Sequence, residues 1–122
     1  MVRVLVTGGR DYRNERRIVF ELDSIRNTIG LDVLIHGDAP GADRLAGRWA
    51  ERRGITVRKW PVNWFPNGKD GGRDDMAGKK RNTQMLAEEA PDLVVAFPGF
   101  AGTNDMVEKA RAAGVRVIEV ES

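Results

Sequence analysis

The sequence contains no cysteine among its 122 residues, and it contains a single histidine, His36. Disulfides, thiolate zinc sites and cysteine nucleophiles are therefore excluded. A lone histidine after a strand is more often structural than catalytic, and His36 has no evident nucleophile to activate. A metal site needs several ligands, and Asp38 and Asp43 alone do not make a convincing set. We therefore expect neither a metal nor a bound cofactor.

Long apolar runs are also missing. No segment approaches the roughly 20 apolar residues that cross a bilayer. The N-terminal stretch "MVRVLVTGG" has an apolar run too short for a signal peptide, and it predicts a first strand instead. We expect a cytoplasmic protein that makes no membrane contact.

A strong excess of charge of one sign is missing too. The 20 Lys and Arg residues nearly balance the 18 Asp and Glu residues, which leaves a net charge of +2. A surplus this small argues against a nucleic-acid partner, because the field around a protein follows its charge. The length and the 41% hydrophobic content predict one domain, residues 1–122, with one core.

Apolar segments of two kinds alternate along the chain. Short β-branched runs predict strands at 2–7, 32–36, 55–62, 92–97 and 115–120. Helical spacing and glycine stops predict helices at 14–29, 41–54 and 103–113, and a further helix that opens at 78–82. This alternation predicts an α/β, Rossmann-like three-layer sandwich: a mainly parallel sheet of about five strands with helices on both faces. In the common strand order 3-2-1-4-5, the first and fourth strands are neighbours.

One connection, from about residue 61 to residue 78, is longer than most loops of compact domains. Trp60, Trp64 and Phe65 argue against disorder, because disordered segments are poor in aromatic residues. We expect a lid that carries Trp64 and Lys69, with a floppy insertion as the alternative.

Polar, turn-rich motifs follow three strands: "TGGRDY", "HGDAPGAD" and "FPGFAGT". Ligands of doubly wound sheets bind beyond the carboxyl ends of the strands, so we expect these motifs to converge on one site. Neither the dinucleotide fingerprint nor a Walker A sequence is present.

Within these motifs, Gly8 and Gly9 would let the backbone approach a ligand, and Arg10 could grip a phosphate or carboxylate. Asp43 either caps the helix that it opens or contacts a ribose hydroxyl or a metal. The cluster from Lys79 to Arg81 opposes the dipole at a helix start, which indicates an anionic partner or a solvated cap.

The chain resembles the YspA-like branch of the SLOG superfamily, the Rossmann-like group named after the SMF/DprA and LOG proteins. The resemblance runs through "VLVTGGRDY" at 4–12, "HGDAPGADRLAGRWAERRG" at 36–54, "RNTQML" at 81–86 and "AFPGFAGTNDMVEKARAAGVRVI" at 96–118, with "W" at 64 and "GK" at 68–69 between them. It implies a nucleotide or nucleotide-derived ligand and a homodimer or higher oligomer. The ligand-binding residues that we expect are Gly8, Gly9, Arg10, Gly37, Asp43, Arg81, Asn82, Pro98, Gly99, Gly102, Thr103 and Asn104.

Two departures from the family pattern bear on catalysis. The LOG enzymes, which cut N-glycosidic bonds, resemble P-G-G-x-G-T-x-x-E, whereas here Phe100 replaces the second glycine and Met106 replaces the glutamate. Asp105 and Glu108 lie about 100° and about 200° around the helix from position 106, so neither is an obvious substitute. Phe100 either offers a face on which a base can stack or plugs the turn against the sheet.

Three functions follow from this resemblance. The leading hypothesis is a nucleotide-ligand sensor or binding protein with no assigned catalytic residue. The second is an N-glycosidic hydrolase that acts on a nucleoside phosphate. The third is single-stranded DNA binding, supported by clustered arginines and three tryptophans and opposed by the small net charge.

Overall fold

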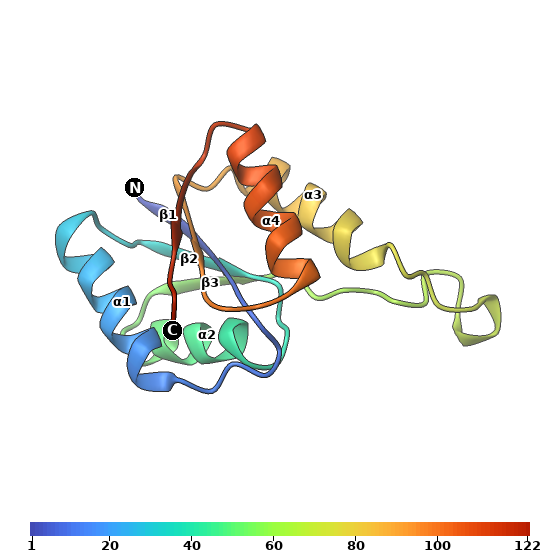
Figure 1. Ribbon diagram of the computed structural model, residues 1–122, viewed down its shortest axis with the longest axis horizontal. Helices are drawn as coiled ribbons and strands as arrows, with labels where there is room; N and C mark the ends of the chain where they lie inside the picture. The colour runs from blue at the N-terminus through green and yellow to red at the C-terminus, as the bar shows by residue number, and fades with distance from the viewer.

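A computed structural model describes residues 1–122, and strands and helices alternate along the chain as predicted (Figure 1). The elements are β1 (Arg3–Thr7), α1 (Glu15–Thr28), β2 (Val33–His36), α2 (Ala42–Arg52), β3 (Thr56–Lys59), a short 3-10 turn η1 (Lys69–Gly71), α3 (Ala77–Glu89), β4 (Leu93–Ala96), α4 (Ala101–Ala112) and β5 (Arg116–Glu119).

The five strands form one parallel sheet in the order β3-β2-β1-β4-β5, which confirms the predicted fold class. The central strand β1 pairs with both neighbours, so that Leu5 lies opposite Ile35 on one side and Val94 on the other. The three inner strands are apolar and buried at residues 4–6, 33–35 and 93–96, because helices cover both faces. All strands therefore end at the same edge, which we call the carboxyl edge.

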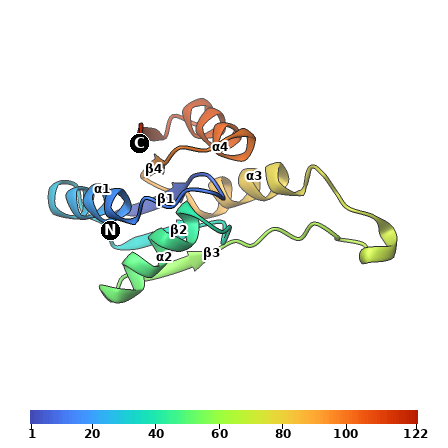
Figure 2. The same ribbon diagram turned by 60° about the horizontal axis from the view of Figure 1, so that its bottom comes forward.

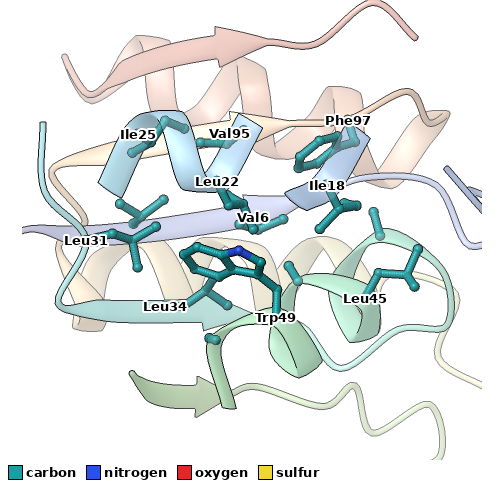
Figure 3. Packing of buried hydrophobic residues seen from close by; sticks show 14 of the residues in the cluster. Val6, Ile18, Leu22, Ile25, Leu31, Leu34, Leu45, Trp49, Val95 and Phe97 are labelled. Carbon is teal, nitrogen blue, oxygen red and sulfur yellow. The ribbon is translucent and has the colours of Figure 1, made fainter. Parts of the chain in front are cut away.

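Each face of the sheet has its own apolar layer. On one face, α1 and α2 pack Ile18, Leu22 and Trp49 against the sheet (Figure 3). The Trp49 indole donates its N–H to the Asp23 carboxylate at 2.9 Å, so this large side chain is buried with its polar atom satisfied. On the other face, α3 and α4 contribute Met85 and Met106. The two layers fix where the helices begin at the carboxyl edge.

Two predicted boundaries differ from the structure in ways that affect the site. The third strand ends at Lys59 rather than at residue 62, because its only neighbour β2 ends at His36, whose carbonyl accepts the Trp60 N–H at 2.8 Å. The last helix begins at Ala101 rather than at residue 103, because the Phe100 carbonyl already accepts the Asn104 N–H at 2.9 Å. Gly102 is therefore a helical residue and not part of the preceding turn.

The long connection between β3 and α3 projects from the body of the domain as an extended arm with η1 near its far end (Figure 2). Most of its residues are exposed. The arm leaves the sheet at the carboxyl edge and returns to it where α3 begins (Figures 1 and 2). None of the helices combines the length and the apolar character that crossing a bilayer requires.

Candidate functional site

A pocket of about 810 Å³ lies at the carboxyl edge, and most of its lining is polar or charged. The ends of β1 and β2, the root of the arm, and the first turns of α2, α3 and α4 all contribute to it. We call it the strand-end pocket. The three turn motifs that the sequence singled out therefore do meet at one place. Eight of the twelve expected ligand-binding residues line it: Gly8, Arg10, Gly37, Asp43, Arg81, Asn82, Gly102 and Thr103.

The other four expected residues, Gly9, Pro98, Gly99 and Asn104, do not line the pocket. The Gly9 N–H donates to the Pro98 carbonyl at 2.8 Å, so this N–H is not available to a ligand. A Cβ on Gly99 would overlap the Thr103 hydroxyl and lie 2.8 Å from the Gly9 nitrogen. Gly9 and Gly99 are thus glycines because two turns pack directly on each other and build the wall behind the pocket.

The first turn of α4 is where the pocket has unpaired backbone donors. The N–H groups of Ala101, Gly102 and Thr103 make no backbone hydrogen bond, as is usual for the first residues of a helix. A Cβ on Gly102 would meet nothing within 4 Å, so open space lies in front of this turn. All three residues line the pocket. The arrangement offers several N–H donors and the positive end of a helix dipole to an anion.

Asp43 is the most deeply buried carboxylate in the pocket wall, with 5% of its surface exposed. Its Oδ2 accepts the N–H groups of Gly37 at 3.0 Å and Ala39 at 3.3 Å, and its Oδ1 has no partner. Capping of its own helix is therefore not its role, because α2 has no side-chain cap and Asp43 braces the preceding loop instead. Burial raises the pKa of Asp43 to about 6, against the opposing effect of those N–H bonds and of Arg81.

Arg81 and Asn82 are more constrained than their sequence suggested. Arg81 Nη1 donates to the carbonyls of Gly37 at 2.8 Å and Trp60 at 2.7 Å. Burial lowers the pKa of Arg81, and the Asp43 carboxylate opposes that shift. Asn82 accepts from Arg81 Nε and donates to the Gly102 carbonyl at 3.2 Å. These two residues thus tie α3 to the β2 loop and to the start of α4, and Arg81 keeps only part of its guanidinium for a ligand.

Two aromatic side chains border the strand-end pocket. Phe100 is 81% exposed, so the alternative in which it plugs the turn against the sheet is wrong. Trp64, on the arm, also lines the pocket, and the Arg73 guanidinium lies 4.3 Å from the centre of its ring. Lys69, the other residue expected on the lid, is not among the lining residues. An exposed aromatic ring at the mouth of a polar pocket suits stacking on a planar base.

The charges around the pocket are mixed. Five basic residues face four acidic ones: Arg10, Arg44, Arg73, Lys79 and Arg81 against Asp11, Asp38, Asp43 and Asp75. Sequence reasoning left out Arg44 and Arg73 as ligand contacts. Arg44 belongs to the "GADR" motif, and its place in a strand-end turn could have indicated a pocket residue. Nothing in the sequence indicates that Arg73, on the arm, lies against the pocket. No group of three or more His, Asp or Glu side chains is arranged to hold a metal ion.

Met106 is completely buried in the apolar layer under α4. Position 106 therefore faces the sheet and not the pocket. The nearby acids do not replace a catalytic glutamate there, because Asp105 pairs with Lys109 at 2.8 Å and Glu108 is exposed outside the pocket.

The fold and the glycine-walled pocket at the carboxyl edge define a Rossmann-like domain of the SLOG type. The chain belongs to the YspA, cpYpsA-related SLOG family (YAcAr), whose model matches residues 2–65. A Gene 61 protein of Mycobacterium phage D29 is 35% identical over 127 residues, which span 97% of this chain and 95% of that protein.

Two solved structures share the fold at low sequence identity. The Moco carrier protein from Chlamydomonas reinhardtii superposes with a TM-score of 0.66 at 22% identity, over 98% of this chain and 75% of that one. DNA processing protein A (DprA) from Streptococcus pneumoniae gives a TM-score of 0.51 at 18% identity, over 97% of this chain and 58% of that one. At these identities the likeness concerns the fold alone.

Proposed function

We propose that this chain binds a nucleotide or nucleotide-derived ligand in the strand-end pocket, in a sensor or binding role. The observation that carries the proposal is the unpaired first turn of α4 beside an exposed Phe100 in a pocket of about 810 Å³. The N–H groups of Ala101, Gly102 and Thr103 receive the phosphate, and Arg10 with the free part of Arg81 balances its charge.

The remaining contacts follow from the same geometry. The Phe100 ring provides a stacking surface for the base. Asp43 Oδ1 is an acceptor without a donor, and a ribose hydroxyl supplies one. Family membership favours this reading, and the carrier of a small molecule among the proteins of similar fold is consistent with it.

Thermal-shift measurements test the proposal. Nucleoside mono- and diphosphates, fragments of NAD and cyclic dinucleotides are each added to the folded protein. We expect at least one of them to raise the melting temperature in a concentration-dependent way, because a ligand that binds only the native state stabilises it. If all of them leave the melting temperature of a folded sample unchanged at millimolar concentration, the proposal is wrong.

The contribution of Phe100 can be measured separately. Phe100→Ala should weaken binding of the stabilising nucleotide about tenfold, because stacking of a base on an aromatic ring contributes about 1–3 kcal/mol. Stability should change little, since the side chain is 81% exposed. Phe20→Ala is the matched control, because Phe20 is 64% exposed on α1 and does not line the pocket. Equal affinity of the two variants, measured by calorimetry, would contradict the stacking role.

A second candidate function is hydrolysis of the N-glycosidic bond of a nucleoside phosphate. Asp43 favours it, because this buried carboxylate with a raised pKa lines the pocket although the usual glutamate position is occupied by Met106. Release of free base from nucleoside monophosphates, lost in Asp43→Asn, would support this function. A protein that binds these nucleotides and leaves them intact would be a binding protein only.

A further inference from the structure

A second polar hollow, of about 230 Å³, opens between α2 and β3. None of its lining residues is hydrophobic. We call it the His36 hollow, after the residue at its back, with Gly47, Arg48 and Lys59 around it. The proposed function gives it no role. It shares only Asp38 and Arg44 with the strand-end pocket.

The back of the hollow carries a hydrogen-bond donor without an acceptor. His36 is 1% exposed, and its Nδ1 accepts the Asp38 N–H at 2.9 Å. The proton of the neutral ring therefore resides on Nε2. Burial lowers the pKa of His36 to about 4, so the ring is neutral near pH 7. Nε2 is buried and has no partner in the protein.

Gly47 packs directly against this donor from α2. A Cβ at position 47 would lie 2.7 Å from His36 Nε2, so a larger residue there would collide with the imidazole at the back of the hollow. Glycine inside a helix is less favourable than alanine, because it loses more backbone freedom on folding. The helix α2 therefore carries a less favourable residue at the point where it packs on the His36 ring.

Basic side chains dominate the mouth of the hollow. Arg48 is exposed and makes no ion pair. Lys59, the neighbour of His36 in the β2–β3 register, contacts Glu51 only at 3.7 Å. Arg44 contacts Asp38 at 3.4 Å. Three bases thus face two acids, and the one buried polar atom of the hollow that lacks a partner, His36 Nε2, is a donor, so the hollow suits an acceptor that carries negative charge.

We propose that the His36 hollow is a second binding site, for a small oxyanion such as phosphate. The His36 Nε2–H donates to one oxygen at the back, and Arg48 and Lys59 neutralise the charge at the mouth. The site is distinct from the strand-end pocket, because the two share only Asp38 and Arg44, an ion pair at 3.4 Å that borders both.

The single histidine makes this site easy to observe, since the ring nitrogens of His36 give the only imidazole signals in an NMR spectrum. We would titrate the ¹⁵N-labelled protein with inorganic phosphate near pH 7 at constant ionic strength. The expected result is a saturable shift of the His36 Nε2 signal and of the Gly47 amide. In Arg48→Gln/Lys59→Gln, phosphate should bind at least about tenfold more weakly, because both charge-assisted hydrogen bonds to the anion are lost.

Arg16→Gln/Arg26→Gln is the matched control that also removes two charges, because Arg16 and Arg26 are exposed bases on α1 that line neither pocket, and it should bind phosphate as the parent protein does. The Thr103 amide reports separately on the strand-end pocket, so phosphate bound only there would shift Thr103 and leave His36 unchanged. An unshifted His36 signal, or a shift that the double variant retains, would overturn the proposal and leave Nε2–H to a buried water. Neither result would decide whether nucleotides bind at the strand-end pocket.

Discussion

Gly99→Ala should lower the free energy of unfolding by about 2–3 kcal/mol, whereas Gly102→Ala, three residues away in the same motif, should not lower it. A Cβ on Gly99 would overlap the buried Thr103 hydroxyl and lie 2.8 Å from the backbone nitrogen of Gly9. None of these atoms is the far end of a flexible side chain, so relief requires the two turns to separate. Separation would also break the bond from the Gly9 N–H to the Pro98 carbonyl.

Gly102 provides the internal control. A Cβ there meets nothing within 4 Å, and the residue lies inside α4, where alanine is favoured over glycine by up to about 1 kcal/mol. Urea unfolding of both variants, followed by circular dichroism, measures the difference directly. Equal stabilities of the two variants would mean that the close packing of the β1 and β4 turns does not constrain residue 99.

The sheet order could be predicted from the sequence because each inner strand is an apolar run that stops at a turn. "VRVLVT" ends at Gly8, and "DVLIH" ends at Gly37. Alternation with helical segments leaves few topologies, and the right-handed crossover rule reduces them further. The position of the pocket could also be predicted from the sequence, since parallel strands bring their carboxyl ends to one edge of the sheet.

The roles of individual residues at that edge could not be read in the same way, because they depend on contacts between distant segments. The sequence places Gly9 and Gly99 in two similar turns, but only the fold shows that they face each other. Arg81 donates to a carbonyl 44 residues away, and no local pattern indicates this bond. Phe100 could be interpreted either way from sequence, and its exposed position depends on how α4 begins at Ala101.

The difference in the free energy of unfolding between Asp43→Asn and the parent protein should change with pH by up to about 3 kcal/mol. The pKa of Asp43 is raised from 3.8 to about 6, and one unit corresponds to about 1.4 kcal/mol. Between these two values the folded state holds a proton that the unfolded state has already lost. The parent protein is therefore penalised as the pH rises through this window, and it regains stability relative to the variant as the pH falls towards 4.

Urea unfolding of both proteins at pH 4, 5, 6 and 7.5 gives this difference. His36 titrates in the same range, but its lowered pKa of about 4 has the opposite effect, because the unfolded chain takes up its proton first. Both proteins contain His36, so its contribution cancels in the difference. Asp75→Asn, whose side chain is 87% exposed in the same pocket wall, controls for the loss of one negative charge.

The same substitution also tests what the unpaired Oδ1 of Asp43 does in the strand-end pocket. An amide that keeps the Gly37 N–H bond presents a donor where the carboxylate offered an acceptor. We expect Asp43→Asn to bind the stabilising nucleotide about tenfold more weakly while it becomes relatively more stable near pH 7.5. A site that gives up stability for binding behaves in this way. A variant with unchanged affinity and no pH-dependent difference would show that Asp43 only braces the loop after β2.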